Sequence, residues 1–157
     1  MTTGAPAIVL RRAGASDAAA IAALAARAYA KWVPVMGRPP SPMFADYAEL
    51  IETHRFDLHE ADGRLVASIA TRTEADFLFI ESVAVEPGWQ GRGIGRALLA
   101  HAEDLARQAG LSELRLLTNA LMAANAALYQ RLGYVLSENE AHPVYGTILH
   151  FRKALSR

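Results

Sequence analysis

Three glycines alternate with larger residues over residues 90–95, directly after an apolar run at 77–85 and directly before an Ala/Leu-rich stretch at 96–109. Glycine lets the backbone approach a ligand closely. The first N–H groups of a helix point towards an anion, with the positive end of the helix dipole behind them. A glycine-rich turn between a strand and a helix therefore predicts that a phosphate-bearing molecule binds at residues 90–96.

Glu81 is the second residue whose type and place indicate chemistry. It interrupts the apolar run at 77–85, where a charge is costly to bury. Strand alternation places Glu81 on one face with Phe79 and Val83. Burial raises the pKa of a carboxyl group, which suits a general base. We expect Glu81 to be this base; the alternative is a structural carboxylate paired with an arginine or lying at the sheet surface.

The composition limits the class of protein. The chain has 157 residues, with 16 basic and 16 acidic side chains, which fits one domain over residues 1–157 and argues against a general nucleic-acid binder. The absence of cysteine excludes disulfides, thiolate metal sites and a cysteine nucleophile. No apolar run is long enough for a membrane span, and residues 1–6 lack the features of a signal peptide. We expect a cytoplasmic protein.

The elements that must position these residues follow from periodicity and from turn signals. Ser16 is expected to cap the first helix, Asp62 and Gly63 to form a hairpin turn, and Gly110 and Gly133 to end two later helices. The expected strands are 8–12, 56–60, 65–71, 77–85, 114–117, one starting at 134, and 147–152. The expected helices are 17 to 29 or 32, 44–53, 96–109 and 123–132. The order predicts a mixed α/β domain with early hairpins and later helical crossovers.

The spacing of the glycines distinguishes between three known phosphate-binding motifs. A Walker A loop ends in Gly-Lys-Ser/Thr, whereas Arg96 and Ala97 follow Gly95. The dinucleotide motif G-x-G-x-x-G also fails, because Gly91, Gly93 and Gly95 are each two residues apart. The third motif, Gln/Arg-x-x-Gly-x-Gly/Ala, is matched completely by residues 90–95.

With this motif the chain resembles the GNAT superfamily of acyl-CoA-dependent N-acyltransferases. Residues 82–87 are similar to the family's central strand, and residues 125–134 are similar to its late helix and the strand after it. The resemblance implies an α/β (α+β) fold with a mixed, mostly antiparallel sheet of six to seven strands. About four helices would flank the sheet, which would be splayed at the acyl-CoA site.

The resemblance also implies how acetyl-CoA binds as co-substrate. The pyrophosphate would contact backbone N–H groups at residues 91–96, and the pantetheine arm would run beside the 83–85 backbone like an extra strand. Arg92 and Arg96 would neutralise phosphates or remain solvated surface charges, and Asn125 would bond the pantetheine or cap its helix. The expected contacts are Val83, Ala84, Val85, Gln90, Gly91, Arg92, Gly93, Ile94, Gly95, Arg96 and Asn125.

The catalytic roles carried by the resemblance are as follows. Tyr129 would be the general acid near the CoA sulfur, since a phenol stays protonated at neutral pH. The backbone N–H of Val83 would stabilise the oxyanion. A frequent base position of the family falls near Leu117, which cannot act as a base and so gives Glu81 more weight. Many members have an asparagine at the position of Met122, so this chain departs from the pattern there.

The acceptor pocket is expected between the first two helices, their connecting loop and the C-terminal strands. Tyr29, Trp32 and Tyr47 come from an aromatic, proline-rich stretch and are the candidates for acceptor contacts, with core packing as the alternative. A late loop at 142–146 lies in reach of the same mouth. No histidine spacing indicates a metal ligand set, so we expect no metal.

Three functions compete. The first is an N-acetyltransferase that moves the acetyl group of acetyl-CoA to a primary amine of a small molecule, amino acid derivative or peptide, by direct attack in a ternary complex. The second is a non-catalytic acyl-CoA-binding regulatory or sensor domain. The third, a tRNA-directed acetyltransferase, is disfavoured by the zero net charge. A homodimer through an exposed edge strand at 147–151 is possible, with no nucleic acid or membrane partner expected.

Overall fold

The computed structural model describes residues 8–156, so residues 1–6, where we expect no signal peptide, lie outside the described part. The strands are β1 (Leu10–Arg12), β2 (Arg55–Ala61), β3 (Arg64–Thr73), β4 (Leu78–Val85), β5 (Glu113–Asn119), β6 (Val135–His142) and β7 (Gly146–Ala154). The helices are α1 (Ala18–Tyr29), α2 (Val33–Met36), α3 (Tyr47–Thr53), α4 (Ile94–Gln108) and α5 (Ala123–Arg131). None of the helices in this part is long and apolar enough to cross a membrane.

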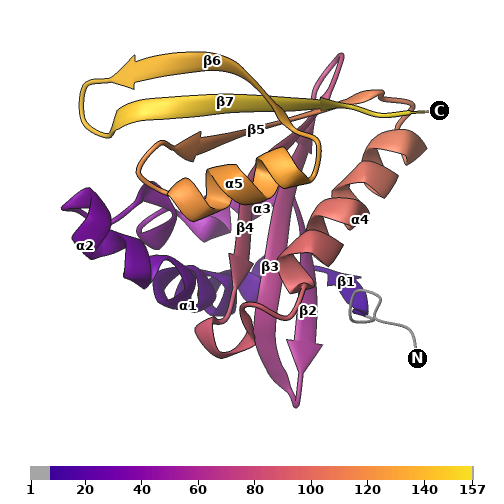
Figure 1. Ribbon diagram of the computed structural model, residues 1–157. Helices are drawn as coiled ribbons and strands as arrows, with labels where there is room; N and C mark the ends of the chain where they lie inside the picture. The colour runs from indigo at the N-terminus through magenta and orange to yellow at the C-terminus, as the bar shows by residue number, and fades with distance from the viewer. Residues whose placement is uncertain (1–7, 157) are drawn as a thin grey trace.

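The strands form one sheet in the order β1-β2-β3-β4-β5-β7-β6 (Figure 1). Every neighbouring pair is antiparallel except β4 and β5. This confirms the predicted mixed, mostly antiparallel sheet. The parallel pair joins only Leu78–Ile80 of β4 to Leu114–Leu116 of β5. Beyond this point β4 continues to Val85 and β5 continues to Asn119, but the two strands no longer pair with each other. The sheet therefore opens between them.

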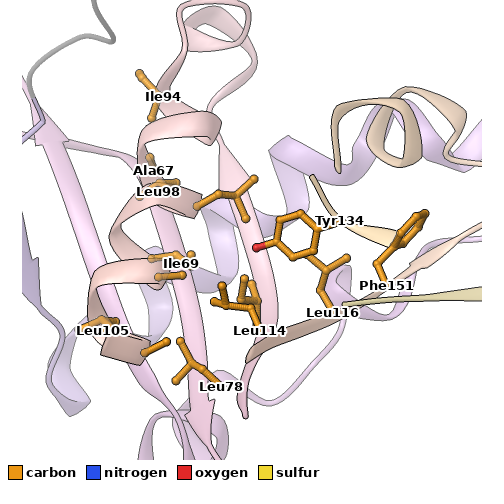
Figure 2. Packing of buried hydrophobic residues seen from close by; sticks show 14 residues of the cluster. Ala67, Ile69, Leu78, Ile94, Leu98, Leu105, Leu114, Leu116, Tyr134 and Phe151 are labelled. Carbon is orange, nitrogen blue, oxygen red and sulfur yellow. The ribbon is translucent and has the colours of Figure 1, made fainter. Parts of the chain in front are cut away.

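Helices cover both faces of the sheet (Figure 1). Alternation along β3 divides its side chains between the two layers: Ala67 and Ile69 pack with α4, whereas Ala70 packs with α1 and α3. Figure 2 shows the first layer, in which Leu98 and Leu105 of α4 meet the sheet. The two packed layers hold β4 in a fixed place, and β4 forms the floor of the site described below.

A β-bulge in β4 lies where the sheet opens. Ser82 pairs with Ala70 of β3, but the next pair joins Ile80 to Thr71. Glu81 is therefore the extra residue of the bulge. A bulge bends its strand and redirects a side chain, which brings Glu81 to the gap between β4 and β5.

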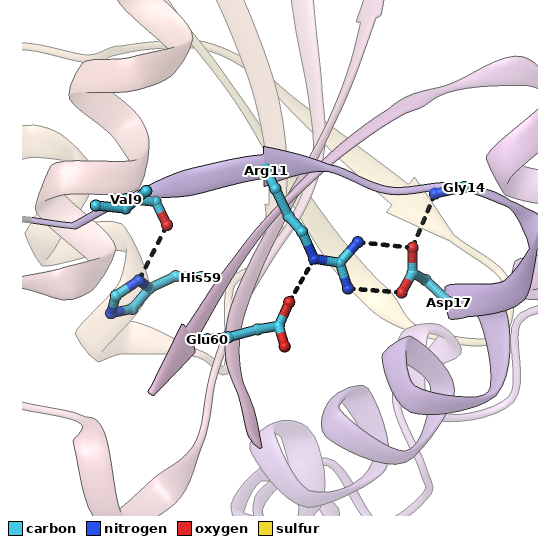
Figure 3. Close-up of polar contacts among 6 residues, drawn as sticks. All are labelled: Val9, Arg11, Gly14, Asp17, His59 and Glu60. Atoms are coloured by element: carbon cyan, nitrogen blue, oxygen red, sulfur yellow. Dashed lines mark hydrogen bonds and ion pairs between the residues drawn. The ribbon is translucent and has the colours of Figure 1, made fainter. Parts of the chain in front are cut away.

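An ion-pair network joins β1 to the start of α1 and corrects one prediction (Figure 3). Asp17 accepts two hydrogen bonds from Arg11, at 2.8 and 3.0 Å, and one from the Gly14 N–H at 2.8 Å. Arg11 also contacts Glu60 of β2. The Arg11 guanidinium, followed by the Gly14 N–H, holds the pKa of Asp17 below its usual value. Asp17, and not Ser16, thus supplies the side chain that fixes the 3-10 turn Ala15–Asp17 directly before α1.

One helix boundary and the position of one strand in the sheet also differ from the sequence prediction. Helix α3 begins at Tyr47 and not at residue 44, because Asp46 caps it by accepting a hydrogen bond from the Glu49 N–H at 3.2 Å. The segment 147–151 is not an edge. It belongs to β7, which lies between β5 and β6, so the edge strand at this end of the sheet is β6.

Candidate active site

A cavity of about 630 Å³ opens at the turn between β4 and α4. We call it the glycine-loop cavity. Its walls come from the end of α1, the open edge of β4, the turn itself and one face of α5. The lining residues of the turn and helix start are Gln90, Gly91, Arg92, Gly93, Ile94, Gly95 and Arg96, which are the seven residues singled out from the sequence.

The backbone of this turn has the form that an anion site requires. Gly91 and Gly93 have φ angles of 79° and 82°, a region that side chains disfavour. Gly93 precedes α4, and the Ala97 N–H bonds to its carbonyl at 3.0 Å. The N–H groups of residues 94–96 have no earlier turn of helix to bond. Gln90 holds the turn on β4 by donating to the Val85 carbonyl at 3.0 Å.

The charges around the glycine-loop cavity are all positive. Lys31, Arg92, Arg96 and Arg131 line it, and no carboxylate does so in the described part of the chain. Arg92 lies over the Trp89 ring, 4.6 Å from its centre. A pyrophosphate with a further phosphate monoester fits this donor set, because backbone N–H groups and several cations converge on one space.

A second cavity, of about 470 Å³, lies at the opening between β4 and β5 and reaches the β6–β7 hairpin. We call it the hairpin cavity. Besides the hairpin, the segment 36–42 and the end of β5 bound it. Four residues line both cavities: Tyr29, Val83, Asn125 and Tyr129. A molecule in one cavity therefore meets a molecule in the other at these four side chains.

Tyr129 lies at this junction with an enclosed ring. The ring packs against Tyr134 and Phe151, with centroids 5.8 and 6.1 Å away. Burial raises the pKa of Tyr129 to about 12, so its hydroxyl is a proton donor at neutral pH. Tyr29 faces the same junction and donates a hydrogen bond from its hydroxyl to the Val83 carbonyl at 3.0 Å. Burial, and then the nearby Tyr129, raise the pKa of Tyr29 well above its usual value.

Glu81 lines the hairpin cavity together with Phe79 and Val83, but Ile80 and Ser82 line it as well, so the lining does not separate the two faces of this bulged strand. The expected burial of Glu81 is wrong, because its side chain is 36% exposed. The bulge turns it towards the cavity mouth and away from the core. Its neighbour is His54, not an arginine: the His54 Nε2 lies 3.6 Å from a Glu81 carboxylate oxygen, and the His54 side chain is only 6% exposed.

The other predicted contacts fall in different places. Trp32 lines the glycine-loop cavity, not the hairpin cavity, with the Lys31 ammonium 5.2 Å from its ring centre. Tyr47 lines neither cavity: it is 6% exposed, packs on Phe56 and donates its hydroxyl to the Pro42 carbonyl at 2.5 Å. Ala84 packs under α1, so its backbone but not its side chain remains for a ligand. Val85 and Asn125 line the glycine-loop cavity.

Sequence reasoning missed Glu140, one residue of the outer wall of the hairpin cavity. Glu140, His142 and Tyr145 from the β6–β7 hairpin line it. Asn119 fixes the hairpin by donating to the Tyr145 carbonyl at 2.7 Å. The loop at 142–146 was expected near the mouth, but only the pairing of β7 with β5 brings Glu140 there. Among residues 8–156, no group of three potential metal ligands is present.

Comparisons with known proteins decide the family. The model of the acetyltransferase (GNAT) family matches residues 20–134. The chain belongs to the GNAT family. In this GNAT protein the matched stretch includes the glycine turn, the bulged strand and the helix that carries Tyr129.

This GNAT protein is similar to curated acetyltransferases in sequence and to solved acetyltransferase structures in fold. Streptothricin acetyltransferase of Streptomyces lavendulae is 35% identical over 97 residues, covering 60% of this chain and 51% of that protein. The chain spans about half the length of the curated relatives it matches. Among solved structures, the ribosomal-protein-S18-alanine N-acetyltransferase from Escherichia coli superposes with a TM-score of 0.78 at 24% identity, covering 95% of this chain and 94% of that one. The PaiA N-acetyltransferase from Thermoplasma acidophilum, solved with coenzyme A, has a TM-score of 0.77 at 18% identity, covering 95% of this chain and 99% of that one.

Proposed function

We propose that this protein is an acetyl-CoA-dependent N-acetyltransferase, built as a single domain over residues 1–157. It would move the acetyl group to a primary amine of a small molecule, amino acid derivative or peptide by direct attack in a ternary complex. The observation that carries the proposal is the meeting of two cavities at Tyr29, Val83, Asn125 and Tyr129. One cavity suits a polyphosphate ligand and the other contains a carboxylate suited to an amine.

The glycine-loop cavity is the proposed acetyl-CoA site. Backbone N–H groups at 91–96 and the side chains of Arg92, Arg96, Lys31 and Arg131 support binding of the phosphates. Val85, together with Val83 and Asn125 at the junction itself, lines the same cavity and would flank a pantetheine arm. Acetyl-CoA supplies the acetyl group as a thioester, which an uncharged amine attacks.

Three groups of this chain would act on that reaction. Glu81 accepts the proton of the amine, directly or through water, since its carboxylate opens into the hairpin cavity. The Val83 N–H stabilises the oxyanion. Its carbonyl is already bonded to Tyr29, and the N–H and C=O groups of one strand residue point to the same edge, here towards the junction. Tyr129 gives its proton, or a hydrogen bond, to the leaving sulfur.

Release of CoA in the presence of an amine panel tests the function. The expected result is amine-dependent CoA release by the wild-type protein, with an acetylated amine found by mass spectrometry. Saturable acetyl-CoA binding without release on any amine would instead establish a non-catalytic sensor. Substituting the junction residue Tyr129 by Phe keeps the binding site and removes the acid, so it links turnover to the proposed centre.

Two further parts of the proposal concern the oligomeric state of the enzyme and its location in the cell. A homodimer would use the exposed edge strand β6, which bears Val135 and Leu136 at 65% and 41% exposure. Sedimentation analysis of the protein, with and without a charge placed at Val135, tests this. A cytoplasmic location remains a prediction, which cell fractionation tests.

A further inference from the structure

The two cavities that meet at Tyr129 carry opposite charges. Four cations and no carboxylate line the glycine-loop cavity in the described chain. The hairpin cavity is lined by two carboxylates, Glu81 and Glu140, and by no lysine or arginine of residues 8–156. One carboxylate suffices to accept the proton of an attacking amine, so the second has no task in the transfer itself.

Glu140 shares one face of β6 with a second carboxylate, that of Glu138. Strand alternation places Glu138, Glu140 and His142 on one face of β6, which bears no lysine or arginine. A single imidazole lies between the two carboxylates: the His150 Nε2 is 2.7 Å from Glu140 and 3.5 Å from Glu138. Even a protonated His150 balances only one of them, so this wall keeps a negative charge.

Within residues 8–156, no lysine or arginine forms an ion pair with Glu138 or Glu140. The Nδ1 atom of His142 accepts hydrogen bonds from the N–H groups of Val144 and Tyr145, at 3.1 and 3.0 Å, so this atom is engaged with the backbone of its own loop. Arg38 lies over the Tyr145 ring, 5.9 Å from its centre, and does not line the cavity. The Glu140 Oε1 atom bonds His150, but within residues 8–156 its second carboxylate oxygen has no hydrogen bond and can bind a cation that enters the hairpin cavity.

We propose that the acceptor carries a second positive charge besides the amine that is acetylated, and that Glu140 binds this charge. The inference rests on the proposed acetyl transfer and names its substrate class. The reacting amine loses its proton to Glu81, whereas the second ammonium stays charged against Glu140. Apolar side chains lie in the same cavity, among them Phe79, Leu116 and Ile148, and suit a methylene chain between the two nitrogens. A diamine or a lysine-like side chain has this form.

A matched series of amines tests the second charge. Each probe has one amino group on a straight four-carbon chain and ends in methyl, hydroxyl, ammonium or carboxylate: butylamine, aminobutanol, diaminobutane and aminobutyrate. We expect the highest kcat/KM for diaminobutane and the lowest for aminobutyrate. An equal or higher kcat/KM for aminobutyrate than for diaminobutane overturns the proposal.

Two variants locate the binding group. In Glu140→Gln, the ratio of kcat/KM for diaminobutane to that for butylamine should fall about fivefold, the value of a half-exposed ion pair. The matched control is Glu138→Gln, which removes the same charge from the same strand and the same histidine but lies outside the cavity lining. Its ratio should stay within about twofold of the wild type. An unchanged ratio in Glu140→Gln, or equal falls in both variants, overturns the assignment to Glu140.

Binding separates this proposal from the proposed function. Diaminobutane and butylamine are titrated calorimetrically into the complex of the protein with CoA, which requires no turnover. Tighter binding of diaminobutane than of butylamine, weakened in Glu140→Gln, supports the second charge even if no amine is acetylated. A lack of acetylation would then count against the proposed enzyme activity alone. Equal affinity for both amines overturns the second charge, even where both are acetylated.

Discussion

Replacing Tyr129 by Phe isolates the hydroxyl at the junction of the two cavities. The ring contacts with Tyr134 and Phe151 remain, and the Tyr129 hydroxyl bonds no other side chain or backbone group of residues 8–156. The variant should therefore fold and bind acetyl-CoA like the wild type. Only the proton or hydrogen bond given to the leaving sulfur is lost.

The size of the loss follows from the kind of hydrogen bond. A bond from a neutral donor to a developing thiolate contributes about 2 to 3 kcal/mol. At about 1.4 kcal/mol for each tenfold in rate, kcat should fall about 30- to 150-fold. The KM for acetyl-CoA should stay within about twofold, because the hydroxyl interacts with the sulfur mainly once charge develops there.

The pH profile gives a second readout for the same residue. An acid must be protonated, so activity that depends on Tyr129 is lost as pH rises through its pKa. Since burial raises this pKa to about 12, the hydroxyl stays protonated through the accessible range. We expect no alkaline fall in wild-type kcat from Tyr129 below about pH 11.

The assay is a thiol reagent that detects released CoA, and it has no protein background because the chain has no cysteine. Tyr134→Phe is the matched control, since Tyr134 is a neighbouring buried tyrosine that lines neither of the two cavities. A kcat for Tyr129→Phe within about threefold of the wild type, with Tyr134→Phe equal to it, would refute the role of Tyr129 as the acid.

Four shorter predictions follow from the same geometry. Glu81→Gln should lower kcat/KM about a hundredfold with unchanged CoA affinity, measured by steady-state kinetics; a loss under about fivefold would exclude it as the base. Gly91→Ala forces a side chain to a φ of 79°, so the KM for acetyl-CoA should rise about fivefold, whereas Gly88→Ala, at ordinary φ in the same turn, should not change it. The buried Tyr134 hydroxyl has no hydrogen-bond partner in the described chain, so Tyr134→Phe should raise the free energy of unfolding by about 1 kcal/mol in urea titrations; a destabilised variant would show that the hydroxyl is satisfied. The pKa of Asp17 is lowered in the folded state, so its stabilisation is present above the unfolded pKa of about 3.9 and is lost as pH falls through the folded value. The stability difference between wild type and Asp17→Asn should therefore vanish in acid, and a difference that grows in acid would contradict the ion pair.

The fold and the glycine-loop cavity could be predicted because their signals are local. Residues 90–96 need glycine at positive φ, a preceding strand and a following helix. Each of these features can be recognised from a few neighbouring residues in the sequence. The mixed sheet followed from the same kind of pattern. Each strand shows its own alternation, and the splay at the acyl-CoA site was implied by the family resemblance.

The hairpin cavity was harder because its wall is assembled by pairing over long distances. Glu140 reaches the cavity only because β7 inserts between β5 and β6, which reversed our expectation that 147–151 is an edge. Glu81 was expected to be buried because a regular strand was assumed, whereas the bulge moves its side chain to the mouth. The role of Asp17 before α1 was missed in favour of Ser16, since the partner of Asp17 is an arginine on strand β1.

The four residues common to both cavities have a consequence for how such proteins diverge. Everything else in the glycine-loop cavity comes from residues 28–32, 85–99 and 128–131, whereas the hairpin cavity draws on 36–42, 79–82, 116–122 and 140–148. The family match ends at residue 134, before the β6–β7 hairpin begins. Mutations in that hairpin leave the matched residues 20–134 unchanged. The outer wall of the hairpin cavity can thus change separately from the glycine-loop cavity, and exchanging the segment 135–154 between relatives is a direct route to new acceptors.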